Sequence, residues 1–297
     1  MTLKSSILKV LVYFDIFHYP VSKEEIRLFM DHPVEDDELA IALQKMVDDA
    51  CIFRHDEFYL LRDDYCLVER RRKGFTRAQP LLATAQRISA LLYRFPYVRG
   101  IGISGSLSKS YADDKADIDY FIITKSNRLW IARTFMHIFK KFTFVAGRQH
   151  WFCMNYFVDE DALEIEEKNI FTAIELVTLL PVCGNGSLIK FFTANDWARL
   201  YYPNQTWRMG SVKATGFSWI KKFTEDLFNN RLGDHLDNYF LQLTTRRWNK
   251  KEAHLQLNAR GIQMGLKNGK HYSKPNPAYF QDKIVALYFD KLKALNI

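Results

Sequence analysis

The chain has 297 residues, of which 48% are hydrophobic and 26% charged, a balance that excludes a disordered or fibrous protein and leaves room for two or three compact units. Lysine and arginine outnumber aspartate and glutamate by 42 to 34, and the net charge of +8 favours an anionic partner such as a nucleotide or a nucleic acid. No uncharged apolar run reaches the length of a membrane span, and the four cysteines stand far apart. We therefore expect buried thiols, no membrane contact and a cytoplasmic location.

The N-terminal part of the chain predicts three helices followed by a hairpin. Apolar residues at helical spacing run over residues 3–17, and Ser22 with Glu25 forms a capping box that starts a second helix. A third helix covers residues 36–49, and the alternating run over residues 52–61 predicts a hairpin. This order resembles a winged helix. Because the third helix is acidic and would repel DNA phosphates, we favour a protein contact over DNA binding for this unit.

The middle of the chain alternates strands and helices. Residues 66–95 are helix-prone and basic at their start, and Pro80 marks a break or a new first turn within them. The elements expected next are strands at residues 97–104, 117–124 and 152–158, a helix at residues 127–139 and a buried helix at residues 171–180.

The last third of the chain predicts a helical region rich in aromatic residues, closed by a helix at residues 278–295. Residues 269–277 are expected to form a loop, because a glycine and two prolines oppose regular structure. Basic side chains in this loop could cover an anionic substrate: Lys270, His271 and Lys274. We therefore expect a mixed α+β protein in three parts: a winged-helix-like unit over residues 1–65, a central domain over residues 66–185 and a helical C-terminal domain over residues 186–297.

Two short motifs in the central part carry the candidate chemistry. Gly105 and Ser106 follow a strand, where small residues let the backbone approach a phosphate and the start of the next helix offers unpaired N–H groups. Asp117 and Asp119 begin the following strand. Because side chains alternate along a strand, both carboxylates face one way while Ile118 points into the core. Two like charges so close together favour a divalent cation, and hard oxygen ligands suit Mg²⁺.

The order of a strand, a Gly-Ser turn, a short helix and an Asp-x-Asp strand resembles the nucleotidyltransferase superfamily of the DNA polymerase beta type. The resemblance covers residues 98–124 closely and residues 75–184 loosely. It implies a nucleotidyltransferase-type central sheet with flanking helices. It also implies an enzyme that moves a nucleoside monophosphate from a nucleoside triphosphate, with loss of pyrophosphate, onto an acceptor that the sequence does not identify: a small molecule, a protein or a nucleic acid.

The resemblance also implies roles for the motif residues. Gly105 and Ser106 would hold the β- and γ-phosphates, and Lys109 could touch phosphate as well. Asp117 and Asp119 would hold Mg²⁺ or Mn²⁺ that orients the phosphates and offsets charge in the transition state. The alternative for the two aspartates is a structural role, as turn caps or as partners of nearby basic residues.

The third strand departs from the pattern of that family, which usually supplies a third carboxylate there. Asn155 stands at the polar centre of this strand, and Asp159 is the nearest acid, at the strand's end. Asn155 could ligate a metal weakly or bind substrate, but it cannot accept a proton near neutral pH. Glu175, in the following helix, is either an exposed residue or a buried partner for a basic group. Three alternatives stay open: Asp159 is the third acid, two carboxylates suffice, or the chain is a catalytically silent module that senses nucleotide or regulates through DNA or protein contact.

Overall fold

The computed structural model of the chain describes residues 2–114, 116–145, 151–208, 219–254, 263–277 and 279–297. Its helices are α1 (Leu3–Asp15), α2 (Lys23–Leu28), α3 (Asp36–Asp48), α4 (Tyr65–Leu92), α5 (Leu129–Val145), α6 (Ile170–Thr178), α7 (Asn185–Ala194), α8 (Ala198–Tyr201), α9 (Trp219–Phe228), α10 (Arg231–Ala253) and α11 (Phe280–Ala294). Its strands are β1 (Val21–Ser22), β2 (Phe53–His55), β3 (Phe58–Leu60), β4 (Val98–Ile103), β5 (Asp119–Thr124), β6 (Cys153–Asp159), β7 (Leu180–Cys183), β8 (Met264–Asn268) and β9 (Tyr272–Pro277). The predicted fold class, mixed α+β, is confirmed.

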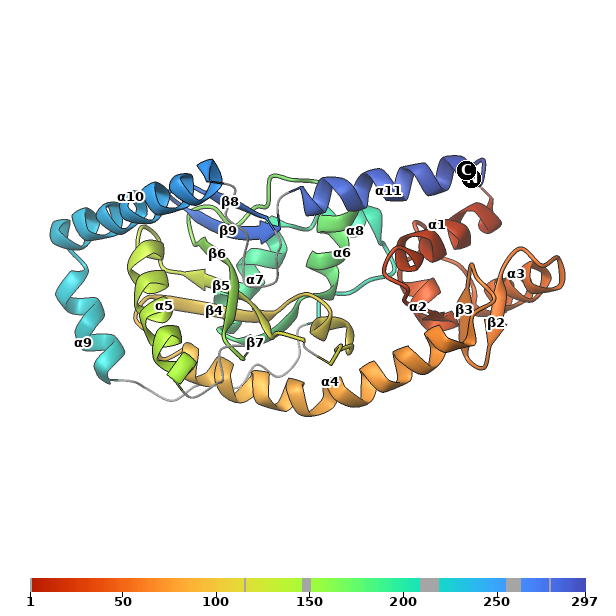
Figure 1. Cartoon of the computed structure of the whole chain (residues 1–297), viewed down its shortest axis with the longest axis horizontal. Coiled ribbons are helices and arrows are strands. Elements are labelled where there is room, and N and C mark those ends of the chain that lie inside the picture. The colour runs from red at the N-terminus through yellow and green to blue at the C-terminus, as the bar shows by residue number, and fades with distance from the viewer. Residues whose placement is uncertain (1, 115, 146–150, 209–218, 255–262, 278) are drawn as a thin grey trace.

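The N-terminal unit consists of α1, α2, α3 and a small sheet in which β3 lies between β1 and β2 (Figure 1). The predicted capping box of α2 is confirmed. The Ser22 hydroxyl accepts a hydrogen bond from the Glu25 amide, and the Glu25 carboxylate accepts one from the Ser22 amide. The three helices and the hairpin expected from the sequence are therefore present, whereas the resemblance to a winged helix stays a prediction.

Helix α4 runs without a break along one long side of the molecule, from the N-terminal unit to the main sheet (Figure 1). The predicted interruption at Pro80 is therefore wrong. A proline inside a helix removes one backbone hydrogen bond and costs about 3 kcal/mol. Pro80 is exposed, and the same helix buries Ala78, Ala85 and Leu92 completely. Packing along this buried side offsets the local cost.

The main sheet has the strand order β7-β4-β5-β6-β9-β8 among the described residues. Strand β5 runs parallel to β6 and antiparallel to β4. The antiparallel register pairs Ile103 with Tyr120, so the end of β4 lies beside the start of β5. The Ser104 amide donates to the carbonyl oxygen of Asp119 at 3.0 Å. This register brings the two predicted motifs together, since one follows the end of β4 and the other opens the antiparallel strand β5.

Two strands that contain proline were not predicted. Residues 180–183 form β7 at an edge of the sheet, the place in a sheet where a proline is tolerated. Residues 272–277, expected as part of a loop, form β9, so that expectation is wrong. Strand β6 pairs with Tyr272 and Ser273, which precede the prolines of β9. Strand β8 pairs with the other edge of β9. The last third of the chain thus supplies two strands to the main sheet as well as helices.

Helix α11 closes the chain against the N-terminal unit (Figure 1). It agrees with the helix expected at residues 278–295, although residue 278 lies outside the described residues. Lys291 of α11 forms an ion pair with Asp15 of α1 at 2.8 Å. All four cysteines are unpaired, but Cys66 is exposed, which the sequence did not predict. Among the described helices, none is long and apolar enough to cross a membrane.

Candidate functional site

Gly105 and Ser106 form a turn directly after β4, and the turn packs against Asp119. Gly105 has a φ angle of +70°, a backbone conformation that side chains disfavour. A Cβ atom added to Gly105 would lie 2.7 Å from Oδ2 of Asp119, closer than such atoms approach in proteins. The position therefore requires glycine for two independent reasons. The structure thus brings together Gly105 and Asp119, two of the residues that the sequence singled out.

The turn is followed by a short 3₁₀ helix (Leu107–Lys109) whose last residue points back toward it. The Lys109 ammonium group lies 3.1 Å from the carbonyl oxygen of Gly105 and 2.8 Å from Oε1 of Glu175. The Gly105 amide donates to the other oxygen of Glu175 at 3.3 Å. Glu175, which comes from α6, is therefore a partly buried partner of a lysine. An ammonium group and a backbone amide that converge on one anionic group would also suit a phosphate.

Asn155 of β6 contacts Asp119 on the side away from the turn. Its amide group donates a short hydrogen bond to Oδ1 of Asp119, and its own oxygen lies 3.0 Å from the Cys153 sulfur. Burial raises the pKa of the Cys153 thiol to about 12, with the Asp119 carboxylate as the next cause and Asp117 as a weaker one. The predicted third-strand residue therefore belongs to the site. It contributes an amide donor to Asp119.

Asp117 lies outside the strand predicted to hold it, because β5 begins at Asp119. The alternation expected around it is nevertheless present. Ile118 is fully buried, whereas Asp117 and Asp119 are both partly exposed. Asp119 lines a cavity beside the turn, and Asp117 is not among the residues that line it. Asp119 lies next to the Gly105–Ser106 turn, with its Oδ2 beside the Cα of Gly105.

Two adjoining cavities open beside the turn. The acidic cavity has a volume of about 210 Å³, and its polar lining residues include Asp119, Asn155, Glu175 and Lys274. The aromatic cavity has a volume of about 330 Å³, and its lining includes Tyr19, Arg70, Ser106, Lys109 and Tyr111. The two cavities share Gly105, Phe171, Glu175 and Phe280. A ligand that fills both has a size typical of protein-bound small molecules, whose sites measure about 300–1,000 Å³.

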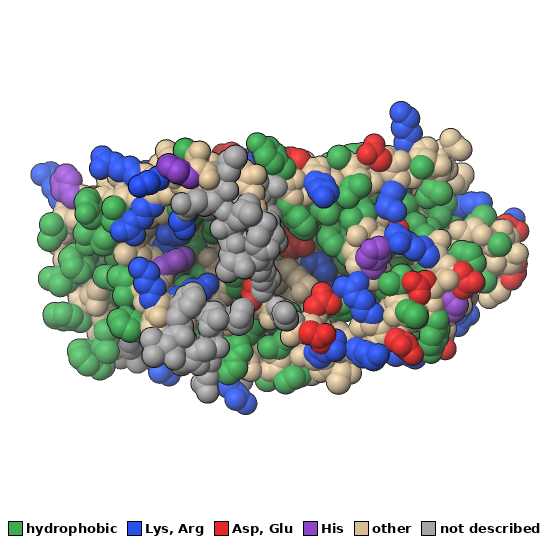
Figure 2. Space-filling view, viewed as in Figure 1, with side chains coloured by type: hydrophobic (Ala, Val, Ile, Leu, Met, Phe, Trp, Pro, Cys, Tyr) green, Lys and Arg blue, Asp and Glu red, His purple; other side chains and the backbone are tan. Residues whose placement is uncertain are grey.

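These cavities collect charged groups from parts of the chain that are far apart in the sequence. A hollow lies near the middle of the face in Figure 2, with acidic and basic side chains in and around it. Lys274 reaches the acidic cavity from β9, where burial lowers its pKa although Glu167 lies 3.5 Å away. Arg70 reaches the aromatic cavity from α4. The sequence drew attention to Lys274 as part of a basic loop, but nothing local marks Arg70 or Tyr19 as a neighbour of the turn.

Asp159 lies at the opposite end of β6 from this site. The parallel register pairs Cys153 with Asp119 and Asp159 with Thr124, so Asp159 is about 20 Å further along the sheet. Its side chain is completely buried and accepts hydrogen bonds from the amides of Asn127 and Asp161, each at 3.0 Å. The alternative in which Asp159 supplies a third carboxylate beside Asp119 does not fit this register.

Asp159 instead belongs to a second group of side chains that could hold a metal ion. One ligand atom each from Asp159, Asp161 and His271 lies within 4.8 Å of the others. His271 Nδ1 lies 2.8 Å from Oδ2 of Asp159, while Ser126 and Asn127 donate to the two oxygens of Asp161. These contacts tie the ends of β5 and β6 to the turn before β9. The sequence missed the group because His271 is more than 100 positions away from the two aspartates.

A larger cavity, of about 510 Å³, lies between α1 of the N-terminal unit, α8 and α11. Its lining is mostly aromatic and aliphatic. Two of its lysines already have acidic partners, Lys9 with Asp31 at 2.9 Å and Lys168 with Glu164 at 2.6 Å. None of the site residues predicted from the sequence lines this cavity. The acidic and aromatic cavities are therefore the better candidates for a functional site.

No family model, curated protein or solved structure matches the chain. The chemistry of the site therefore rests on the side chains that the fold brings together. These are a glycine turn beside a carboxylate, a lysine and a backbone amide that bind one anionic group, and adjoining acidic and aromatic cavities.

Proposed function

We propose that the chain is a metal-dependent nucleotidyltransferase, which transfers a nucleoside monophosphate from a nucleoside triphosphate to an acceptor. The observation that carries the proposal is the contact between Gly105 and Asp119. A turn that can approach phosphate is useful for this chemistry only if a metal-binding carboxylate lies next to it. Here Oδ2 of Asp119 lies only 2.7 Å from the position that a Cβ atom of residue 105 would take, which supports a shared site for the two functions.

The triphosphate tail would bind at the turn. The Gly105 amide and the Lys109 ammonium group converge on Glu175, and a phosphate oxygen that displaced this carboxylate would accept the same two hydrogen bonds. Ser106 lines the aromatic cavity on the same side. These contacts support binding of the triphosphate tail at the turn.

The residues around the acidic cavity suit a magnesium or manganese ion. Asp119 and Glu175 present carboxylates on either side of Gly105, and Asp117 adds negative charge nearby. Carboxylate oxygens are the ligands that these hard cations prefer. Such an ion, when bound, offsets the negative charge that develops on the transferred phosphoryl group. Asn155 holds one oxygen of Asp119 and so fixes the orientation of that carboxylate.

The nucleoside would lie in the aromatic cavity. The rings of Tyr19 and Tyr111 lie edge to face with their centroids 5.7 Å apart, and both line the cavity. A base can stack on such rings without a specific hydrogen bond, so this arrangement supports nucleotide binding without selecting one base. Arg70 lines the same cavity and stacks 5.6 Å from the Tyr111 ring centre.

The second candidate function is a catalytically silent module of the same fold, which binds nucleotide as a sensor or regulator. Asn155 favours it, because this residue occupies the third-strand position with an amide that cannot accept a proton. Among the described residues that line the acidic cavity, Glu175 is the carboxylate besides Asp119, and Lys109 already engages it. Turnover would therefore require Glu175 as the general base, or an acceptor group that is acidic enough to lose its proton without one.

The two functions can be separated by following both binding and transfer. The full chain is incubated with each labelled nucleoside triphosphate, Mg²⁺ or Mn²⁺ and small-molecule, protein and nucleic-acid acceptors, and label transfer and pyrophosphate release are measured. Asp119→Ala is compared with Asp48→Ala, which removes an exposed carboxylate of α3. Transfer that Asp119→Ala abolishes and Asp48→Ala retains supports the enzyme. Binding without pyrophosphate release supports the silent module, and a chain that binds no triphosphate refutes both.

A further inference from the structure

Helix α9 presents its apolar side to solvent. Four residues, spaced one, three and four positions apart, form the α9 stripe: Trp219, Ile220, Phe223 and Leu227. Their exposed fractions are 69%, 55%, 63% and 50%. Every residue of α9 is described, and none of them is buried. A surface helix normally turns its apolar side toward the core, so this orientation implies a surface that something else covers.

The opposite side of α9 is polar, and it is this side that faces the main sheet. The Lys221 ammonium group donates to the carbonyl oxygen of Val98 at 2.7 Å. The Glu225 carboxylate forms an ion pair with Arg99 at 2.7 Å. Lys221 and Glu225 are four positions apart and so lie on one side of the helix. Both reach the region of β4, and together they fix how α9 is rotated about its axis.

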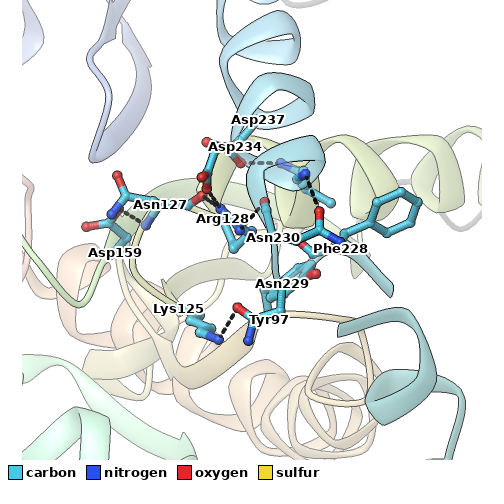
Figure 3. Close-up of polar contacts among 12 residues, drawn as sticks. Tyr97, Lys125, Asn127, Arg128, Asp159, Phe228, Asn229, Asn230, Asp234 and Asp237 are labelled. Atoms are coloured by element: carbon cyan, nitrogen blue, oxygen red, sulfur yellow. Dashed lines mark hydrogen bonds and ion pairs between the residues drawn. The ribbon is translucent and has the colours of Figure 1, made fainter. Parts of the chain in front are cut away.

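The corner between α9 and α10 is anchored equally firmly. Arg128, which is 5% exposed, donates to the carbonyl oxygens of Phe228 at 3.1 Å and Asn230 at 3.2 Å (Figure 3). The same guanidinium group forms an ion pair with Asp234 at 2.6 Å. The last residue of α9 is thus held to the start of α5. The outward direction of the stripe is therefore a property of the fold and not of a loosely attached helix.

We propose that the α9 stripe is the contact surface between two copies of this chain, related by a two-fold axis near Phe223. Two α9 helices that pack antiparallel about such an axis place Trp219 of one copy opposite Leu227 of the other, and Phe223 opposite its own counterpart. Lys222 and Asp226 lie together on one flank of the stripe. About this axis Lys222 of each copy lies near both Lys222 and Asp226 of the other, so this flank forms two opposite-charge pairs for one like-charge pair.

The exposed apolar area fits a dimer contact. Large side chains bury about 150–250 Å² each, so the partly exposed stripe offers on the order of 500 Å². Leu232 and Tyr239 of α10, which are 61% and 57% exposed, add on the order of 200 Å². Hydrophobic side chains gather over α9 and the neighbouring part of α10 in Figure 2. A stable protein interface needs about 800 Å² from each partner, which this surface approaches before any polar rim is counted.

A membrane surface fits the stripe less well than a second copy does. Helices that lie on anionic lipid carry basic residues along the flanks of their apolar side. Asp226 stands on the same flank as Lys222, and its charge would be repelled by anionic headgroups. An opposite charge across a protein interface suits both residues.

The test is the association state of the full chain, measured by sedimentation equilibrium over a wide range of concentration. Phe223→Asp is compared with Ile41→Asp, since Ile41 of α3 is 71% exposed and also carries an apolar side chain on a helix. We expect the wild type and Ile41→Asp to form dimers with the same affinity. Phe223→Asp should weaken dimerisation about 30-fold or more, as for a central aromatic residue of an interface.

A charge exchange tests the two-fold arrangement itself. Lys222→Asp and Asp226→Lys should each weaken the dimer, and the double variant that carries both should restore it. A wild type that stays monomeric at every concentration refutes the proposal. So does a monomer that binds vesicles of anionic phospholipid through the stripe, with binding lost in Phe223→Asp and kept in Ile41→Asp.

Discussion

Replacing Gly105 with alanine tests the contact on which the proposed function rests. Residue 105 has a φ angle of +70°, and a non-glycine residue in this left-handed region costs about 1–2 kcal/mol. The new Cβ atom would lie 2.7 Å from Oδ2 of Asp119, so the carboxylate must move as well. We expect Gly105→Ala to lower the free energy of unfolding by about 1–2 kcal/mol. We also expect it to weaken binding of a metal–triphosphate complex about 10- to 100-fold, as when the residues that orient a metal ligand are changed.

Gly186→Ala is the matched control for this substitution. Gly186 lies in α7 and is exposed, and no atom lies within 4 Å of the Cβ atom that alanine would add. Its stability should stay unchanged or rise slightly, because alanine favours a helix by up to about 1 kcal/mol over glycine. Urea denaturation gives the free energies, and calorimetric titration with Mg²⁺ and a non-hydrolysable triphosphate gives the affinities. Wild-type affinity in Gly105→Ala, in a folded protein, would refute a phosphate site at this turn.

Two further predictions concern buried aspartates that do not line the acidic or the aromatic cavity. Asp159→Ala should lower the free energy of unfolding in urea by about 3 kcal/mol, because three groups that hydrogen-bond to this buried carboxylate lose their acceptor. Triphosphate affinity should not change, since Asp119 is about 20 Å away. A loss of affinity at full stability would contradict this assignment. Burial raises the pKa of Asp237 to about 6 from an ordinary value of 3.8. Between these two values the folded state keeps a proton that the unfolded state releases. The free energy of unfolding should therefore fall as the pH rises from about 4 to 6. The side-chain oxygen of Asp237→Asn can still accept the hydrogen bond from the Ile131 amide, so this variant should fold without the pH dependence. Urea midpoints measured from about pH 4 to 6 test this. An unchanged dependence of the midpoint on pH would show that another group is responsible.

Local sequence patterns were sufficient for most helices and for the strands at the centre of the sheet. The capping box at Ser22 and Glu25 depends on neighbouring residues alone, and so does the apolar periodicity of α1 and α3. The sequence linked the two motifs only through the resemblance to a known family. The antiparallel pairing of β4 and β5, which brings the end of one strand beside the start of the next, is a finding of the structure.

The sequence misled where tertiary contacts outweighed local preference. Pro80 and the prolines of residues 272–277 oppose regular structure on their own, yet α4 continues because its other side is buried, and β9 forms because β6 and β8 pair with it. Asp159 stands four residues from Asn155 in the chain. On a strand this separation carries it to the other end of the sheet, so nearness in sequence gave the wrong neighbour.

By itself the sequence determined the fold class, the order of most elements and the places of a glycine turn and an acidic strand along the chain. Only the tertiary structure decided that Glu175 and Lys274 reach this cleft, that Asn155 holds Asp119 and that α9 turns its apolar side outward. The physical reason is the range of the forces involved. Periodicity, capping and turn geometry act between residues a few positions apart, whereas the partner of a buried charge is set by how distant elements pack.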